Sequence, residues 1–483
     1  MQQYETTIGL EIHVELATKT KLFCGCSTKF GEDANTNVCP VCMGLPGALP
    51  VLNRKAVEHA MAVALACNCE INRECYFDRK NYFYPDNPQN YQISQFYHPI
   101  GIGGYVEIET EDTGKTIRIH EMHMEEDAAK LLHFDEEKKT VPDYNRSGVP
   151  LLEIVTEPDF STGEEVVAFL EKLRLMIQYL GASDCRMQEG SLRVDVNLSV
   201  RKAGQERPGT RTEMKNLNSF RSVLRAVREE SRRQIELLKN GGVVLQETRR
   251  WNEKTNTSQA MRLKETTAEY RYFREPDLVK VAISEEWILQ VQSQKPELRE
   301  EKIKRYVSEF QLPEYDAGIL TSSVQMAQLF EETTKLCNEP KEVSNWLMTE
   351  MMRLLRENGQ DGEYITMQPK KFASLILMVK QGKINRTVAK CVFEELFLNE
   401  TDPEAFVTAQ GLFLQENETK LREVAEQVCK EFPKSVSDYR GGKEQALGFL
   451  IGQTMKATSG KANPGKIREI LLGLLRIDDE NKA

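Results

Sequence analysis

The spacing of apolar residues changes once along this chain, near Pro296, and that change limits what the chain can fold into. Before it, apolar and polar side chains alternate, most clearly in Ile8–Leu16 and Ser191–Arg201. Such alternation places one face of a strand in a core and leaves the other face polar. After it, apolar residues recur at helical spacing in one segment after another. The sequence predicts an α+β fold: an N-terminal β-sheet domain with flanking helices, then all-helical domains.

The N-terminal region also contains two segments with helical spacing. The first begins after Thr162, whose hydroxyl can cap a helix, and ends at Gly181. The second runs from about Ser219 to Asn240 and carries a row of arginines. The chain has 483 residues, which allows about three domains. We therefore expect the helical part to divide again near residue 400.

Charge and cysteine content narrow the class of protein. Lys plus Arg is 64 and Asp plus Glu is 74, a net charge of −10 that argues against nucleic-acid binding through bulk charge. The N-terminus lacks the basic and apolar segments of a signal peptide, so we expect a cytoplasmic protein. An odd number of cysteines, 11, then argues for metal ligands or free thiols and against a disulfide framework.

The cysteines are concentrated near the N-terminus, where two close pairs stand out. Cys24 and Cys26 form the first pair, and Cys39 and Cys42 form the second. Four thiolates in two short loops can surround a tetrahedral Zn²⁺ and leave no open position, so the expected site is structural. The alternative is that the four side chains are small buried apolar groups.

A second group of polar residues lies on the polar faces of the expected strands. Carboxylates with one imidazole, brought together on one sheet, suit Mg²⁺ and leave positions open for phosphate oxygens. Nearby basic side chains can neutralise the phosphates of a nucleotide. The alternative is that these are ordinary solvated strand faces. The acidic and imidazole candidates are Glu11, His13, Glu125, Glu153, Asp195 and Glu213, and the basic candidates are Arg193, Arg201, Arg211 and Lys215.

Two longer segments have an unusual composition. Residues 186–233 hold 12 Lys or Arg and 6 Asp or Glu, which fits contact with phosphate or RNA, or a solvated Arg-rich helix. Residues 78–97 interleave Tyr and Phe with Asn, Gln and Pro. That run fits an ordered loop that lines a site, or a packed surface loop.

Two enzyme classes find no support in the sequence. Gly460–Lys466 has the spacing of a nucleotide-binding loop, but Ile467 stands where Ser or Thr would contact Mg²⁺. No G-x-S-x-G motif occurs and no histidine follows residue 133, so we do not expect the chain itself to be a glutaminase. Any ATP is therefore expected to bind without a Walker loop.

Several long motifs follow one another along the whole chain. They are IGLEIHVEL, DRKNYFYPDNPQNYQISQF, HMEEDAAK, VPLLEIVTEPD, GSLRVDVNLSVR, GTRTEMKNLNSF and IGQTMKATSGKANP. Together they closely resemble the GatB family, the B subunits of the bacterial and organellar aspartyl/glutamyl-tRNA amidotransferases, in the order that the family has them.

The resemblance implies an activity shared with partner proteins. A chain of this kind would use ATP and Mg²⁺ to phosphorylate the side-chain carboxylate of misacylated Glu-tRNA(Gln), Asp-tRNA(Asn) or both. Ammonia released from glutamine by the amidase, the A subunit, would then displace the phosphate, in a heterotrimer that includes a small C subunit. The contrasting hypothesis is a non-catalytic, zinc-knuckle tRNA-binding scaffold, which would have no need of converging metal ligands.

The resemblance also implies roles for particular residues. Ammonia would pass Lys80 and Glu126, while the cysteine pairs would hold Zn²⁺ as scaffold. The Mg²⁺ site would be lined by Glu11, His13, Glu125 and Glu153, with Asp195, Glu213 and Lys215 near the nucleotide or acyl group.

Finally, the resemblance implies domain limits. We expect a cradle domain at 1–292, a helical domain at 293–400, and a YqeY-like helical domain at 401–483 that contacts tRNA. The expected phosphate contacts are Lys456, Lys461, Lys466 and Arg468.

Overall fold

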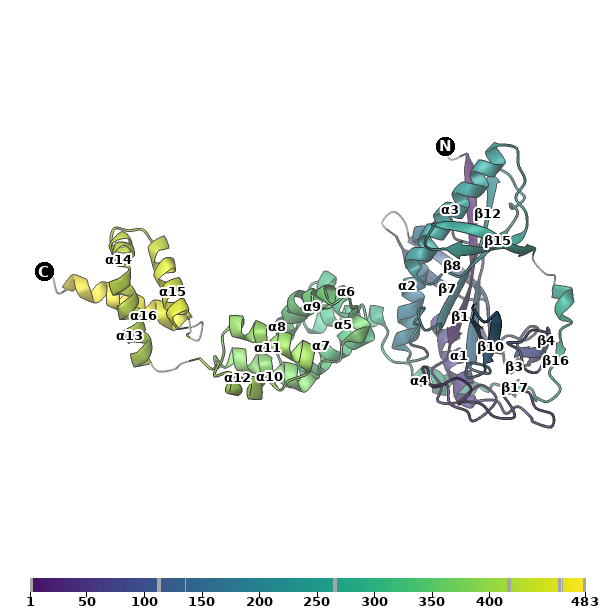
Figure 1. Ribbon diagram of the computed structural model, residues 1–483, viewed down its shortest axis with the longest axis horizontal. Coiled ribbons are helices and arrows are strands. Elements are labelled where there is room, and N and C mark those ends of the chain that lie inside the picture. The colour runs from purple at the N-terminus through teal and green to yellow at the C-terminus, as the bar shows by residue number, and fades with distance from the viewer. Residues whose placement is uncertain are drawn as a thin grey trace. The chain divides into compact units, whose positions relative to one another are not determined.

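The computed structural model describes residues 3–110, 114–134, 136–263, 267–414, 418–458, 462 and 464–480. The chain divides into two units, Met1–Leu298 and Arg299–Ala483 (Figure 1). The first contains the sheets and a few helices, and the described part of the second contains helices alone. The predicted α+β class is confirmed.

The first unit is built on a ten-stranded sheet in which β1 and β12 are central neighbours. All its neighbouring strands run antiparallel except β13 and β14, which are parallel. The strand order is β15 (Thr257–Leu263), β14 (Glu247–Asn252), β13 (Thr212–Lys215), β12 (Leu192–Lys202), β1 (Tyr4–Glu15), β11 (Pro150–Thr156), β8 (Gly114–Glu126), β6 (Gly101–Ile102) and β2 (Glu70–Ile71), with β7 (Tyr105–Glu109) paired to β8 off this path.

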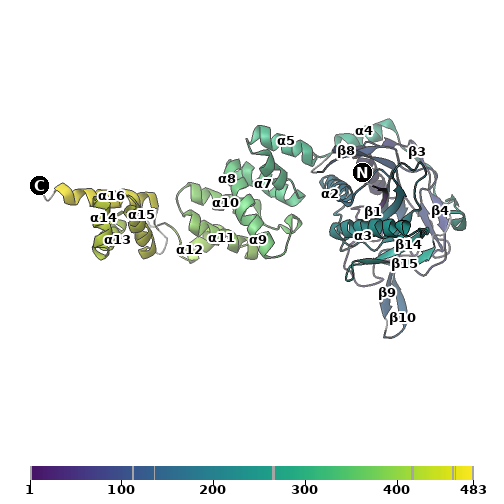
Figure 2. The same cartoon turned by 90° about the horizontal axis from the view of Figure 1, so that it is seen from above.

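One face of this sheet forms the core of the unit. Along β1, Leu10, Ile12 and Val14 are at most 1 % exposed, as the alternating pattern predicts. Helices α2 (Gly163–Tyr179) and α3 (Phe220–Lys239) lie side by side over this face (Figures 1 and 2). The opposite face is left to the polar residues that alternate with the core.

The two predicted helices begin where their capping residues predict. The Thr162 hydroxyl accepts a hydrogen bond from the Glu165 backbone N–H at the start of α2, and Ser219 accepts one from Ser222 at the start of α3. A third helix, α1 (Arg54–Ala66), packs against β8 and α2, and α4 (Glu285–Ser293) packs against α1.

Three small sheets and a short 3₁₀ helix complete the first unit. In one of them, β4 carries β5 on one side and β16 on the other, which brings residues near 273 beside residues 78–94. The small sheets are β10 (Lys139–Asp143) with β9 (Lys130–Phe134), β16 (Phe273–Arg274) with β4 (Asp78–Asn81) and β5 (Tyr91–Ser94), and β17 (Val281–Ala282) with β3 (Glu74–Cys75), and the 3₁₀ helix is η1 (Thr267–Tyr270).

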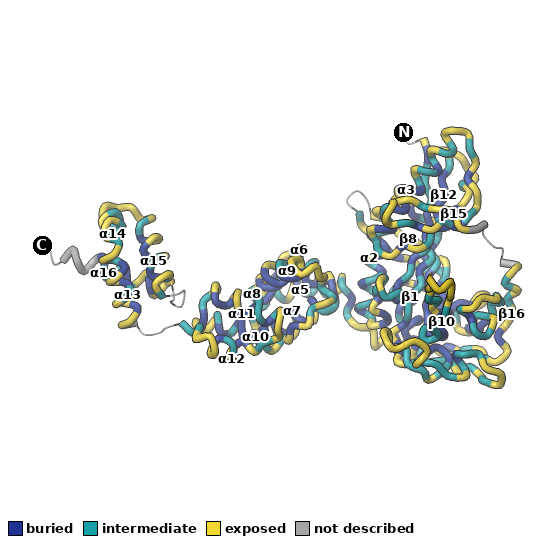
Figure 3. The backbone as a smooth tube through the Cα atoms, in the orientation of Figure 1, coloured by how far each residue is buried: buried dark blue, intermediate teal, exposed yellow. Residues whose placement is uncertain are grey.

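The second unit contains two separate hydrophobic clusters, one from Tyr306 to Val407 and one from Leu421 to Leu475 (Figure 3). The predicted domain limits at 292 and 400 stay predictions.

No helix in the described part of the chain combines the length and the apolar character that a membrane span requires. The helices of this unit are α5 (Arg299–Glu309), α6 (Glu314–Leu320), α7 (Val324–Cys337), α8 (Pro340–Trp346), the π-turn η2 (Leu347–Met351), α9 (Met352–Glu357), η3 (Gly362–Tyr364), α10 (Pro369–Lys380), α11 (Arg386–Asn399), α12 (Pro403–Ala409), α13 (Glu418–Glu431), α14 (Pro433–Arg440), α15 (Gln445–Ala457) and α16 (Pro464–Glu480).

Candidate functional site

The polar face of the sheet carries a row of charged side chains at one level. His13 on β1 lies opposite Glu153 on β11 and opposite Arg193 on β12, and Glu153 lies opposite His123 on β8. Residues directly opposite one another in paired strands point to the same face. The strand register therefore brings together side chains that are far apart in sequence.

The ligand atoms of this row form two overlapping groups, Glu11 with His13 and Glu153, and His123 with Glu125 and Glu153, and within each group they lie at most 4.8 Å apart. His13 Nε2 lies 3.3 Å from Glu153 Oε2, 3.7 Å from Glu125 Oε1 and 3.8 Å from Glu11 Oε1. His123 Nε2 lies 3.0 Å from the same Glu153 oxygen. The predicted ligands Glu11, His13, Glu125 and Glu153 are thus brought together, and their role as ligands stays a prediction.

Strong electrostatic coupling holds these groups together. Burial lowers the pKa of His13, but the neighbouring Glu153 and Glu125 carboxylates raise it to about 9. The same balance raises the pKa of His123 to about 9. Burial raises the pKa of Glu153, yet the two imidazoles hold it well below its usual range, while burial and Glu153 raise the pKa of Glu11 to about 6.

This donor set fits a hard divalent cation. Carboxylate oxygens from Glu11, Glu125 and Glu153 with an imidazole nitrogen are ligands that Mg²⁺ accepts. His123 Nδ1 is buried and has no hydrogen-bond partner among the described residues. Glu121 Oε1 lies 3.8 Å from this nitrogen, too far for a hydrogen bond, and an ion or substrate group between them would satisfy both atoms.

The row borders a cavity of about 310 Å³ that is also lined by two basic residues, Lys80 and Lys215. Lys215 Nζ lies 2.5 Å from Asp195 Oδ2 and 3.6 Å from Glu213 Oε1, and these carboxylates, against the effect of burial, raise the pKa of Lys215 above its usual value. Lys80 Nζ lies 5.1 Å from the centre of the Tyr270 ring. Burial lowers the pKa of Lys80, but Glu125 and its neighbours raise it to about 12, so both lysines stay cationic.

The other predicted basic residues lie outside this cavity. Arg193 Nη2 donates to Asp127 Oδ1 at 2.9 Å, and Arg201 Nε donates to Glu5 Oε2 at 2.9 Å. Arg211 is exposed and precedes β13. Their assignment to nucleotide phosphates stays a prediction, and Arg193 already has a carboxylate partner.

Several residues that line the cavity were not singled out by the sequence. Glu121, His123 and Glu125 follow one another at two-residue spacing on β8, a pattern from which the sequence could have predicted that all three share one face. No sequence pattern indicated that Tyr270 and Tyr272 line the cavity. They reach it through the pairing of β16 with β4, two strands that are far apart in sequence.

The four cysteines of the predicted metal site also converge. Their sulfur atoms lie within 4.8 Å of one another, and Cys39 Sγ and Cys42 Sγ are 3.9 Å apart. The Cys39 backbone N–H and Lys21 Nζ donate to Cys42 Sγ at 3.2 and 3.5 Å. Contact with Cys24 and these donors outweighs burial and lowers the pKa of Cys42 to about 4, which suits a metal-bound thiolate.

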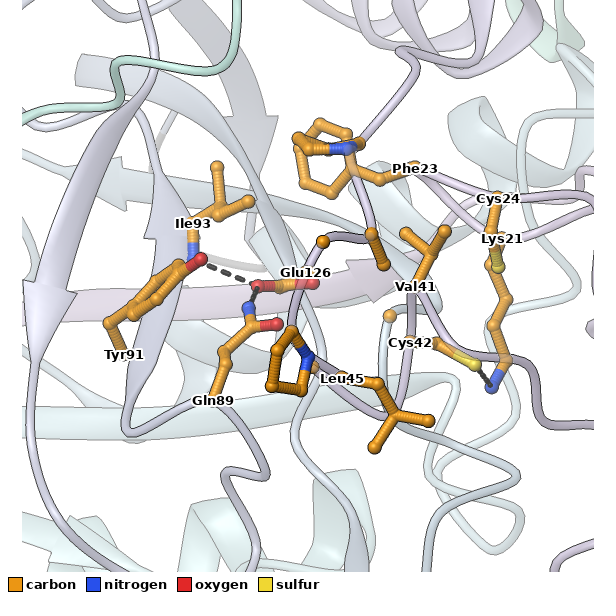
Figure 4. Close-up of a pocket in the computed structure, with 16 residues that line it drawn as sticks. Lys21, Phe23, Cys24, Val41, Cys42, Leu45, Gln89, Tyr91, Ile93 and Glu126 are labelled. Atoms are coloured by element: carbon orange, nitrogen blue, oxygen red, sulfur yellow. Dashed lines mark hydrogen bonds between the residues drawn. The ribbon is translucent and has the colours of Figure 1, made fainter.

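A second cavity of about 230 Å³ borders this cysteine cluster (Figure 4). Cys24 and Cys42 line it on one side, and Gln89 and Glu126 line it on the other. Glu126 directly follows Glu125 on β8, so the two carboxylates point to opposite faces of the strand and into different cavities.

The predicted tRNA contacts are on the last two helices. Lys456 lies on α15, and Lys466 and Arg468 lie on α16, all three exposed. Lys461 falls outside the described residues.

Comparison with known proteins decides the family. Residues 6–289 match the family described as GatB/GatE catalytic domain, and residues 328–475 match the GatB domain. The chain belongs to the GatB family. It is 58 % identical to the B subunit of aspartyl/glutamyl-tRNA(Asn/Gln) amidotransferase from Lachnoclostridium phytofermentans, with 98 % of this chain and 99 % of the relative covered. The protein of the same name from Agathobacter rectalis is 57 % identical, with 98 % of this chain and 100 % of the relative covered. The one from Lachnospira eligens is 56 % identical, with 99 % of this chain and 100 % of the relative covered.

The family predicted from the sequence motifs is confirmed. With it, the prediction that the chain is an enzyme subunit of the glutamine-dependent amidotransferase class is confirmed.

We expect the imidazoles of His13 and His123 to titrate near pH 9 in metal-free protein. Because the folded state binds these protons more tightly than the unfolded state, their contribution to stability is complete below about pH 6.5 and is lost as the pH rises through about 9. Added Mg²⁺ should lower the His13 midpoint, since cation and proton compete for the same nitrogen atom, and the His123 midpoint through repulsion between the ion and the protonated ring.

The measurement is NMR of ¹⁵N-histidine-labelled protein, with His13→Gln to assign its signal. Midpoints close to the ordinary histidine value for both rings would contradict this description of the site.

Proposed function

We propose that this protein phosphorylates the side-chain carboxylate of misacylated Glu-tRNA(Gln), Asp-tRNA(Asn) or both with ATP, and then forms the amide with ammonia. The observation that carries the proposal is a cavity lined by Glu11, Glu125 and Glu153 together with Lys80 and Lys215. His13 lies within 3.8 Å of each of these three carboxylates. Relatives that share more than half of their residues with this chain are named for tRNA(Asn/Gln) amidotransferase activity.

The chemistry explains why such a site is needed. A carboxylate is a poor electrophile, so one of its oxygens first attacks the terminal phosphorus of ATP, and ADP leaves. Ammonia then attacks the acyl carbon, and phosphate leaves with that oxygen. Mg²⁺, when bound by the three carboxylates and His13, would neutralise charge on the transferred phosphoryl group.

The residues of the chain would then position the reactants. Lys215 would offset the remaining phosphate charge, and its ammonium is held in place by Asp195 and Glu213. The Thr248 hydroxyl donates to Glu213 Oε2 at 2.8 Å and fixes that carboxylate in turn. Such preorganised charge contributes most to phosphoryl transfer, because little else is required of the protein.

Ammonia would arrive from the amidase, the A subunit, in a heterotrimer with the small C subunit. We place its route past Glu126 and Lys80, which line the two cavities on opposite faces of β8. Glu126 Oε1 accepts hydrogen bonds from Gln89 Nε2 at 2.6 Å and from the Ile93 backbone N–H at 3.0 Å. Burial raises the pKa of Glu126 to about 8, which limits the charge that a neutral ammonia molecule would meet.

Two further roles lie away from the reacting groups. The cysteine cluster would hold Zn²⁺ as a structural ion, since four thiolates leave no open position. The exposed basic residues of α15 and α16 would contact the phosphates of tRNA.

The proposed activation step predicts the effect of Glu125→Gln. Amidated aminoacyl-tRNA should fall by roughly 100-fold or more, because the carboxylate acts on charge that develops only in the transition state. Ammonium chloride in place of glutamine should not rescue this variant, since the acyl phosphate never forms, but it should rescue a complex with an inactive amidase. Glu107→Gln, an exposed change on β7, is the matched control and should keep wild-type activity.

The yield to measure is amidated aminoacyl-tRNA with ammonium chloride as the nitrogen source. Wild-type yield from Glu125→Gln would show that the carboxylates are structural and that activation occurs elsewhere.

The cysteine cluster predicts about one Zn²⁺ per chain in protein purified without added metal. Cys39→Ser should lose the ion and lower the thermal stability of the first unit, because a structural zinc contributes directly to folding. Cys391→Ser removes an exposed thiol outside the cluster and should change neither property. Elemental analysis and thermal unfolding test this, and a metal-free protein as stable as the zinc-loaded one would refute it.

A further inference from the structure

The cavity that holds the acidic cluster has an aromatic wall that the activation chemistry does not use. Phe96, Tyr270 and Tyr272 line it. The Phe96 and Tyr272 rings are stacked, with centroids 4.1 Å apart and an interplanar angle of 16°. Tyr270 meets Tyr272 edge-on at 6.1 Å. The three rings therefore lie together in the lining of a cavity that also holds charged groups.

Core packing does not explain these rings. Phe96 is 40 % exposed, and among the described residues neither it nor the two tyrosines belongs to the hydrophobic core of the first unit. Large aromatic side chains that line a cavity and lie outside the core cluster typically mark a binding surface.

Polar contacts to one strand hold the wall in place. The buried Asp78 carboxylate on β4 accepts hydrogen bonds from the backbone N–H groups of Phe96 and Tyr97 at 2.9 and 3.0 Å. Asn81, also on β4, donates to the Tyr270 and Arg271 carbonyls at 3.3 and 2.8 Å. The same strand carries a lysine of the proposed reaction site, so wall and site share one support.

The chemistry of the proposed substrates suggests what the wall binds. Both carry adenine, ATP as its base and tRNA as the terminal adenosine that bears the amino acid. In the aminoacyl-tRNA, only a ribose and the amino acid itself separate the base from the reacting carboxylate. If the reacting carboxylate of the substrate lies beside Glu125, the base of the terminal adenosine therefore lies close to the same cavity. Aromatic side chains stack on a base with about 1–3 kcal/mol each.

We propose that Phe96, Tyr270 and Tyr272 form a stacking platform for an adenine ring. The short connection between base and carboxylate favours the terminal adenosine of tRNA, and the adenine of ATP is the other source of the same chemistry. This inference rests on the proposed function. Lys80 Nζ, near the Tyr270 ring, would face the adjacent ribose and phosphate.

The test compares Phe96→Leu and Tyr272→Leu with Phe273→Leu in the assembled amidotransferase. Phe273 directly follows Tyr272 and is 47 % exposed, but it does not line the cavity. With ammonium chloride as the nitrogen source, the two platform variants should raise KM for one adenine-bearing substrate about 10-fold, the loss of one stacking contact, with kcat within about twofold. The control should change neither.

The two KM values identify the source of the adenine. A rise in KM for misacylated tRNA assigns the platform to the terminal adenosine, and a rise in KM for ATP assigns it to the nucleotide. Unchanged KM values for both substrates in both variants would overturn the proposal.

A binding measurement separates this inference from the proposed function. Transfer RNA and ATP analogues with 2-aminopurine in place of the adenine should lose fluorescence on binding to the wild-type complex, and Tyr272→Leu should abolish that loss for one of them. Quenching by a complex that forms no amide would support the platform and contradict the proposed function. Amide formation without quenching of either analogue would overturn the platform alone.

Discussion

The pairing of β1 with β11 on one side and β12 on the other is the constraint on which the candidate site depends. In this register His13 faces Glu153 and Arg193, and Glu11 faces Asp195. A shift by one residue would turn the polar side chains into the core and the apolar ones outward. The buried face of β1 under α2 and α3 therefore fixes the site on the other face.

The same register concentrates charge that the protein must neutralise. Glu125 is 4 % exposed and lies within reach of two imidazoles and, in the same cavity, Lys80. Burying a carboxylate without a partner costs free energy of folding, so these cationic groups stabilise the metal-free protein. A metal ion bound with its substrate would replace them as the partners of the carboxylate. The buried Asp127 carboxylate is instead matched by Arg193 and Arg146.

Local patterns predicted much of the fold. Alternation located β1 and β12 to within a few residues, and Thr162 and Ser219 marked the starts of α2 and α3. The β1 strand begins earlier than its apolar alternation indicates, because Tyr4 still pairs with Lys202 on β12. The cysteine cluster was predictable for the same reason, since each pair is set by a short loop.

Features that depend on distant strands were not predictable in the same way. His123 became a neighbour of Glu153 through the β8–β11 register, which the sequence does not specify. Tyr272 reached the cavity through the β16–β4 pairing. Arg193 has the charge expected of a phosphate contact, but the structure places it against Asp127, a residue distant in sequence.

The proposed function requires that the side-chain carboxylate itself receives the phosphoryl group. The most direct measurement uses misacylated tRNA with ¹⁸O in that carboxylate, together with ATP, ammonium chloride and the complete amidotransferase. Mass spectrometry of the released inorganic phosphate then follows the label. We predict that one ¹⁸O atom is transferred to phosphate for each amide formed. Amide formation with unlabelled phosphate would contradict the proposed activation step.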